Sequence, residues 1–125
     1  MIQRFIELGE GYSDLYELLE IAHSNKHRLA QMIVLHTTIR NEKRASVLVV
    51  LHPAAQGNFQ PLYVCLEGIP AQSKRLQLFL DAAQELHQQV ITFDVQPADT
   101  FGEKELYFQY LTGILRLNYL IPPLL

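Results

Sequence analysis

Three β-rich runs at the centre of the chain constrain its fold more than any other feature. They lie within residues 32–66 and read MIVLHTTI, SVLVVL and PLYVCL. Aliphatic, β-branched and aromatic residues in such runs favour strands, and three runs in succession predict the centre of a sheet. The segments on either side carry apolar residues at helical spacing, so we expect helices to cover that sheet.

Turn and capping residues divide the rest of the chain into further elements. Residues 2–8 alternate with period two and precede Gly9 and Gly11, which predicts a first strand and a tight turn. Ser13 is expected to cap the helix that follows, and Ser73 or a neighbour a second helix. Thr100 and Glu103 match a capping box for the third helix.

The patterns together predict five strands and three helices. The expected strands are 2–8, 28–39, 47–51, 62–66 and 90–95, and the expected helices are 13–25, 73–86 and 103–118, with a polar turn at 41–44.

The pattern of these elements indicates how the sheet is built. Residues 47–51 form an unbroken apolar run, which is typical of a middle strand covered on both faces. A helix separates the strands at 62–66 and 90–95, and such a connection usually makes a parallel right-handed crossover. The sequence therefore predicts one α/β domain over residues 1–125, with α+β as the alternative. Its mixed sheet has about five strands with three helices, in the order βαβββαβα.

Composition narrows the cellular setting and the class of partner. Hydrophobic residues make up 49% of the chain and charged residues 18%, as in a globular protein. The net charge is −3 and the basic residues are scattered, which disfavours nucleic acid as a partner. The single cysteine, Cys65, lies in an apolar strand pattern, where a buried inert thiol in a reducing compartment is expected. With no signal-peptide pattern and no long apolar stretch, we expect a cytoplasmic protein without a membrane segment.

The last predicted helix is apolar around nearly its whole circumference, and the tail YLIPPLL adds more apolar residues. One sheet face covers only one side of a helix, so we expect the remainder to contact a second copy of the chain or another protein. The alternative is that the tail folds back over its own sheet. The expected interface residues are Tyr107, Phe108, Tyr110, Leu111, Ile114, Leu117 and Leu120.

Three polar residues near the ends of predicted strands are the candidate site. His52 follows the middle strand, Glu67 follows the next strand, and Asp94 lies near the end of the fourth core strand. Open α/β sheets bind ligands beyond the carboxyl ends of their strands, so these side chains could form a ligand site. A solvated rim is the alternative, because Asp and Glu are usually exposed. His36 is expected about four residues from His52 along the sheet, roughly 13 Å, which is too far to share a metal.

Other constellations predict no cofactor and no metal. His23 and His27 have the spacing of a two-histidine zinc site, but the helix ends near Asn25 and the glutamate of a zinc-protease motif is missing. The two glycines after the first strand resemble part of a dinucleotide turn, although the third glycine is absent. No catalytic set can be assembled from these residues.

The order helix, three strands, helix, strand resembles the core of the PD-(D/E)xK nucleases. That family holds its metal with an acid around the middle strand, followed by an acid, a spacer and a lysine on the next strand. Here the middle strand reads SVLVVLHP, and Glu67 is followed after one residue by Ile69. The resemblance is therefore one of strand order, and nuclease activity is not predicted.

Three longer stretches, MIQRFIELGEGYSDLYELLEIA, FQPLYVCLEGIP and GEKELYFQYLTGILRLNYLIPPL, resemble a family of small uncharacterised proteins from Bacillus-type bacteria. Some members carry the label methylthioribose kinase. Such a kinase has two lobes, a phosphate-binding glycine loop, a lysine on the next strand and magnesium-binding acids, and none is found here. The resemblance implies a cytosolic bacterial protein without an assigned activity.

Together these observations predict a non-catalytic protein that acts by association, as a homodimer or a partner-binding module. The alternative is an enzyme or a small-molecule-binding protein that uses His52, Glu67 and Asp94.

Overall fold

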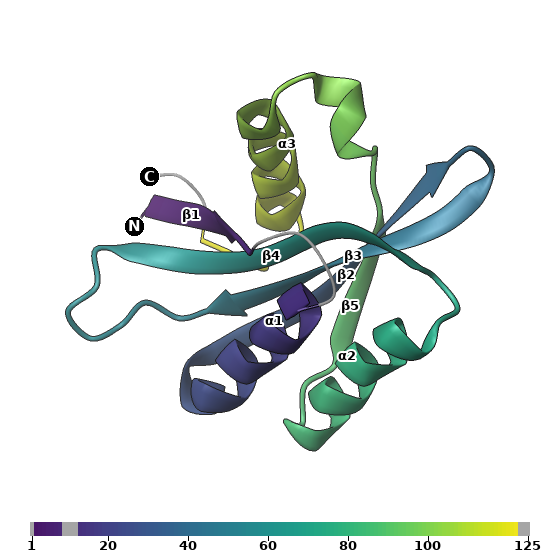
Figure 1. Cartoon of the computed structure of the whole chain (residues 1–125). Coiled ribbons are helices and arrows are strands. Elements are labelled where there is room, and N and C mark those ends of the chain that lie inside the picture. Colours follow the sequence, from purple (N-terminus) through teal and green to yellow (C-terminus); the bar gives the residue numbers. More distant parts are fainter. Residues whose placement is uncertain (1, 9–12, 123–125) are drawn as a thin grey trace.

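The computed structural model describes residues 2–8 and 13–122, and its elements follow the predicted order. The mixed sheet and the three helices form an α+β fold (Figure 1). The strands are β1 (Ile2–Glu7), β2 (Leu29–Ile39), β3 (Glu42–Leu51), β4 (Phe59–Pro70) and β5 (Val90–Asp94). The helices are α1 (Ser13–Ser24), α2 (Lys74–Glu85) and α3 (Lys104–Leu117), with short 3-10 helices η1 (Lys26–Arg28) and η2 (Ala98–Phe101).

The sheet has the strand order β1-β4-β3-β2-β5. Strand β3 lies in the middle as predicted, antiparallel to both neighbours, and its residues from Ala45 to Leu51 are buried. Strand β1 pairs in parallel with β4, and β5 pairs in parallel with β2. Because β4 and β2 are both antiparallel to β3, and β5 is parallel to β2, the strands β4 and β5 run in the same direction. The predicted parallel crossover from β4 through α2 to β5 is therefore confirmed. The expectation of a core strand at 90–95 is wrong in one respect, because β5 forms an edge of the sheet.

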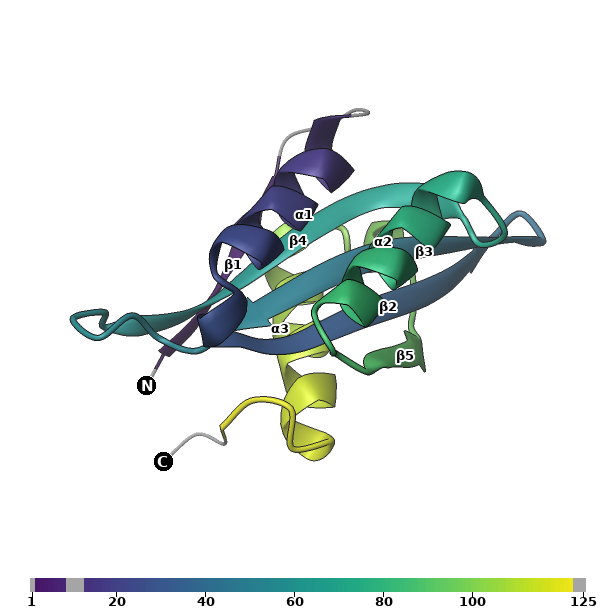
Figure 2. The same ribbon diagram turned by 90° about the horizontal axis from the view of Figure 1, so that it is seen from below.

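Helices cover both faces of the sheet, which explains the unbroken apolar run in β3. Helices α1 and α2 pack on one face and α3 crosses the other (Figures 1 and 2). Alternate residues of β3 point into two cores: Val47 and Val49 face α1 and α2, whereas Leu48 and Val50 face α3. Cys65 on β4 is buried in the first of these cores, as predicted.

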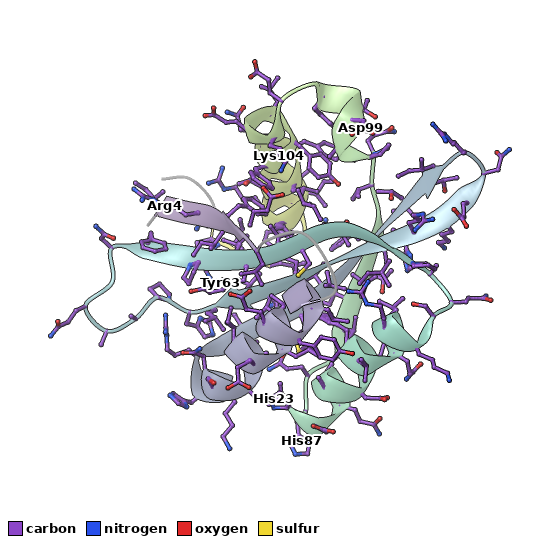
Figure 3. All side chains as sticks on the ribbon, in the orientation of Figure 1. Arg4, His23, Tyr63, His87, Asp99 and Lys104 are labelled. Atoms are coloured by element: carbon purple, nitrogen blue, oxygen red, sulfur yellow. The ribbon has the colours of Figure 1, made fainter. Side chains whose placement is uncertain are left out.

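Contacts from β1 tie the edge of the sheet to α3. The rings of Phe5 and Phe108 are stacked with their centroids 4.5 Å apart. Nζ of Lys104, labelled in Figure 3, donates to Oε1 of Glu7 at 2.7 Å. These contacts join the first strand to the last helix, so α3 is fixed on the sheet by residues from both ends of the chain.

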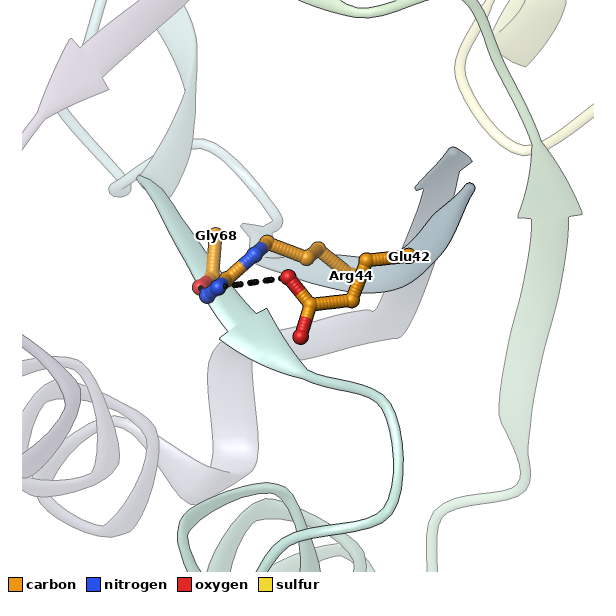
Figure 4. Close-up of polar contacts among 3 residues, drawn as sticks. All are labelled: Glu42, Arg44 and Gly68. Carbon is orange, nitrogen blue, oxygen red and sulfur yellow. Dashed lines mark hydrogen bonds and ion pairs between the residues drawn. The ribbon is translucent and has the colours of Figure 1, made fainter. Parts of the chain in front are cut away.

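The hairpin between β2 and β3 differs from the expected polar turn at 41–44. Arg40 and Asn41 form a two-residue turn, both with positive φ (53° and 63°), as in a type I′ hairpin. Residues 42–44 belong to β3 because the backbone ladder continues under polar side chains. Nη1 of Arg44 donates to the carbonyl of Gly68 on β4 at 2.7 Å, and its Nη2 lies 2.9 Å from Oε2 of Glu42 (Figure 4).

Helix capping was predicted correctly for α2 and incorrectly for α3. Oγ of Ser73 accepts a hydrogen bond from the backbone N–H of Leu76. Thr100 lies inside η2, and the N-cap of α3 is Glu103 without a side-chain cap. The capping box fails because Gly102, with φ of 73°, turns the chain between Thr100 and the helix. The predicted turn at Gly9 and Gly11 and the side chain of Ser13 lie outside the described part of the structure.

Candidate functional site

The structure does not bring the three predicted site residues together. His52 follows β3, whose last residue, Leu51, pairs with Leu29 at the start of β2. Asp94 pairs with His36, seven residues further along β2 and therefore about 24 Å away. Because β3 runs antiparallel to β2 and β4, its carboxyl end lies at the opposite end of the sheet from the ends of β4 and β5. The expected strand-end cluster is therefore not formed.

Glu67 and Asp94 lie toward the same end of the sheet but on separate strands. Strand β4 carries Glu67 and β5 carries Asp94, and both β3 and β2 lie between them. Three strand spacings separate their backbones by about 14 Å. The side chain of Glu67 is outside the described set.

The expected spacing between His36 and His52 is also too short. Ala45 is the partner of His36 in the β2–β3 ladder, and His52 lies seven residues beyond Ala45. The separation along the sheet is therefore about 24 Å rather than 13 Å. The error comes from the turn, which occurs at residues 40–41 and so shifts the register of β3.

A cleft of about 680 Å³ lies beside His52, between this end of the sheet and the segment that follows α3. Among the described residues that line it, none carries a carboxylate, an ammonium, a guanidinium or a thiol. Such a surface can stack, exclude water and form hydrogen bonds through its amides, the imidazole of His52 and the hydroxyl of Tyr119. The lining residues are Ala30, Gln31, His52, Pro53, Gln60, Tyr119, Leu120, Ile121 and Pro122.

Arg28 fixes the position of His52 at the edge of this cleft. The N–H of His52 donates to the carbonyl of Arg28 at 2.6 Å. In return, Nε and Nη2 of Arg28 donate to the carbonyl of His52 at 3.2 and 3.1 Å. The guanidinium group therefore donates to a backbone oxygen and fixes the position of the chain just after β3.

A buried amide, that of Gln60, forms one part of the polar lining of the cleft. Gln60 is only 4% exposed, although it belongs to a polar residue type. Its Oε1 accepts a hydrogen bond from Nε2 of Gln3 at 3.3 Å, and Oε1 of Gln3 accepts one from Nη2 of Arg116. Within the described residues, Nε2 of Gln60 has no hydrogen-bond partner. The network therefore leaves one donor next to the cleft.

Tyr119 lies at the mouth of the cleft in an unfavourable backbone conformation. It follows α3 at the position usually occupied by glycine, with φ of 59°. The N–H of Tyr119 donates to the carbonyl of Arg116, and that of Leu120 to the carbonyl of Leu115, which is a Schellman motif. A tyrosine in this region is strained, and its side chain is 91% exposed. It gains almost no packing in return.

Reasoning from the sequence found His52 but missed Gln31, Gln60 and Tyr119. Gln60 follows directly after Phe59 in a segment interpreted as a loop, so its burial could not be seen. Tyr119 could have been noticed, because the residue after a helix end is commonly glycine or asparagine.

His36 lies outside this cleft, on the face that α1 and α2 cover. Its Nδ1 is buried and has no hydrogen-bond partner in the described part of the chain. Burial lowers the pKa of His36 below 6.5, and the positive charge of Lys43 acts in the same direction, while Asp94 opposes it. The imidazole is therefore kept neutral, which fits a packed residue rather than a proton carrier.

A second hollow, of about 480 Å³, lies between the ends of α1 and α2. His23, His27 and His87 line it together with Glu85, and Figure 3 shows His23 and His87 near each other. Nε2 of His23 is 3.8 Å from Oε2 of Glu85. Across the described residues, no group of three or more such side chains has the geometry to hold a metal ion.

The predicted interface residues on α3 fall into two sets. Tyr107 and Leu111 are each 1% exposed and belong to the core beneath the helix, so they cannot contact a partner. Phe108, Tyr110 and Ile114 of the helix and Leu120 of the tail are half-buried against that core, so these residues pack on the chain's own sheet. Leu117 is 79% exposed and Leu106, which was not predicted, is 45% exposed. Only the outward surface of α3 is therefore free.

Fold and cleft together define a small α+β protein with a cleft whose described lining residues include no carboxylate, ammonium or guanidinium group. The chain belongs to the family described as Domain of unknown function (DUF7147), whose model matches residues 1–121. Neither a curated protein nor a solved structure matches it. In the described ranges, every helix is too short or too polar to cross a membrane.

Proposed function

We propose that this chain is a cytosolic bacterial protein that acts by association, as a homodimer formed through the outward surface of α3. Part of this surface, here called the outer stripe, consists of Leu106, Tyr110, Gly113 and Leu117 and is flanked by the exposed Glu105 and Gln109. At 100° per residue the four residues of the stripe lie within about 60° of one another around the helix, and the two leucines are about 16 Å apart along it. The ten residues from Leu106 to Leu115 include no charged side chain.

The symmetry of the outer stripe carries the proposal. Leu106 and Leu117 are equidistant from the point between residues 111 and 112, and so are Tyr110 and Gly113. Two copies of α3 packed antiparallel about a two-fold axis at this point would pair Leu106 with the partner's Leu117 and Tyr110 with the partner's Gly113. A two-fold interface requires such a self-complementary surface.

The local shape also fits close helix packing. A Cβ atom added at Gly113 would meet nothing within 4 Å, so the surface is open there. Tyr110 stands beside it, and its hydroxyl accepts a hydrogen bond from the N–H of Gln96, which holds the ring in place. A fixed large side chain opposite a glycine allows two helices to approach closely. Because one helix pair buries less than a standard interface, we expect micromolar dissociation.

Sedimentation velocity across the micromolar range tests the proposal. We expect a concentration-dependent dimer for the native chain and a monomer for Leu117→Glu, because two buried carboxylates would replace an apolar contact. Leu78→Glu is the matched control, since Leu78 is 37% exposed on α2 at the opposite face. A native chain that stays monomeric throughout, or equal effects of the two variants, would contradict the dimer.

Cysteine crosslinking tests the antiparallel arrangement. A mixture of Leu106→Cys and Leu117→Cys chains should form a disulfide between the two variants, whereas each variant alone should crosslink slowly. Cys65 is 1% exposed and so does not compete. Rapid crosslinking of either variant with itself would show a parallel arrangement instead and would contradict the pairing proposed here.

A further inference from the structure

From the cleft beside His52 we infer a binding site for a small, neutral, planar molecule that carries adjacent hydrogen-bond donors and acceptors. Nucleobases and nucleosides belong to this class. Tyr119 would stack on the ring, and the amides of Gln31 and Gln60 would bond to its edge. The inference does not depend on the dimer, because the cleft is formed within one chain.

The strain at Tyr119 is the first observation. Glycine would satisfy the left-handed conformation without cost, yet the position holds a large aromatic residue that is 91% exposed. Backbone strain that brings no packing in return is commonly found at binding sites. An exposed tyrosine at the mouth of a cleft offers a flat face on which a planar ligand can stack.

The buried amide of Gln60 is the second, independent observation. Gln60 is only 4% exposed and it lines the cleft. None of the described residues accepts a hydrogen bond from its Nε2. This Nε2 is not one of the buried atoms that lack a partner, so it is reached from the cleft and can donate to a molecule bound there. Gln31 adds a second amide with both a donor and an acceptor.

The absence of charge among the described lining residues defines the ligand further. Arg28 is close, but its guanidinium group is engaged by the carbonyl of His52. A phosphate or carboxylate would find no cation to pair with, whereas a neutral base would find amides of the kind that bind base edges. A volume of about 680 Å³ also fits a molecule of this size.

Saturation-transfer NMR with adenosine, guanosine, cytidine and uridine, one at a time, tests the inference. We expect at least one nucleoside to receive saturation and its affinity to fall at least tenfold in Tyr119→Gly, whose fold should be at least as stable as the native one. Tyr16→Ala is the matched control, because Tyr16 is also exposed, at 56%, but lies on α1. Gln31→Leu should weaken the same nucleoside.

Three results would overturn the inference. The first is no saturation transfer to any nucleoside at millimolar concentration. The second is binding that Tyr119→Gly and Gln31→Leu leave unchanged. The third is tighter binding of the 5′-phosphates than of the nucleosides, which would show a charged ligand. Leu117→Glu, which tests the dimer, should bind as the native chain does, so the two proposals fail separately.

Discussion

Arg28 binds the backbone of His52 from 24 positions earlier in the chain, and it does so with both its side chain and its main chain. The guanidinium group donates two hydrogen bonds to the carbonyl that lies just beyond β3. This contact joins η1 to the end of the central strand, and it sets the place where His52 meets the cleft.

Replacing Arg28 should loosen this end of the sheet. We expect Arg28→Ala to lower the free energy of unfolding by about 1 kcal/mol, because three side-chain hydrogen bonds, two to His52 and one to Asn25, are lost while the backbone bond remains. Arg28→Lys should recover little, because an ammonium cannot donate as a fork. Urea denaturation measures both, with Lys26→Ala as the control from η1. If Arg28→Ala and Lys26→Ala were equally stable, the Arg28 side chain would not stabilise this end of the sheet as predicted.

Glycine should stabilise the chain at two helix ends. His87 and Tyr119 both follow a helix with positive φ, and both belong to Schellman motifs. We expect His87→Gly and Tyr119→Gly each to raise the free energy of unfolding by about 1 kcal/mol, because glycine adopts this conformation without strain. Thermal and urea unfolding provide the measurement.

The control for these two variants is Gln77→Gly, an exposed position inside α2 and away from its C-terminal motif. There glycine should lower stability by about 1 kcal/mol, since it is a poor helix former. The two gains should add in the double variant, because the sites lie on different helices. A loss of stability in either single variant would show that its side chain supports the fold.

Stability should depend on the protonation of His36. Burial lowers its pKa in the folded state below 6.5, so the unfolded chain takes up a proton at higher pH than the folded one. The unfolded state then binds more protons, so the contribution of His36 to stability is fully present above pH 6.5 and is lost as the pH drops below 6.5. Urea unfolding between pH 5 and 8, about the range in which imidazole titrates, should show this slope.

The variant His36→Gln should flatten that pH dependence, because it removes the titrating group. His27→Gln, at an exposed position in η1, should leave the slope as it is in the native chain. An unchanged slope in His36→Gln would assign the pH dependence to other groups.

A methyl group on Gly68 should disturb Arg44. A Cβ atom there would lie 2.9 Å from Cδ of Arg44, so the side chain must move away from the carbonyl of Gly68 and from Glu42. We expect Gly68→Ala to cost about 1 kcal/mol of stability. In an Arg44→Ala background the cost should largely disappear, and a double-mutant cycle measures this coupling. If Gly68→Ala lowered stability equally in the native chain and in Arg44→Ala, the predicted clash between the added methyl group and Arg44 would be wrong.

Which segments form strands and which form helices could be predicted from the sequence, because this depends on the spacing of apolar residues within each segment. The unbroken run in β3 indicated a strand covered on both faces, and the apolar stripe of α2 with Ser73 before it indicated a capped helix; both are confirmed. Strand lengths were underestimated because β3 and β4 continue through polar residues, where backbone pairing rather than side-chain burial holds them. The capping box failed because the left-handed Gly102 interrupts a pattern that sequence alone presents as continuous.

The candidate site could be predicted only one residue at a time. His52 was identified because it ends a strand, and it does line a cleft. Its expected neighbours Glu67 and Asp94 lie elsewhere, because the direction of β3 relative to its neighbours depends on long-range pairing. Gln60 carries no local signal that marks it as a cleft residue, and the place of Tyr119 after a helix end marks its backbone conformation but not the cleft.

The sequence by itself determined which segments are strands and helices, which strand is central, and that both faces of the sheet are covered, because each of these follows from the spacing of apolar residues. Only the tertiary structure decided that His52 stands apart from the acids, that Tyr107 and Leu111 turn inward while Leu117 turns outward, and that Tyr119 borders a cleft. Those facts depend on which end of each strand lies beside which helix. Pairing between distant segments fixes that arrangement, and no local pattern records it.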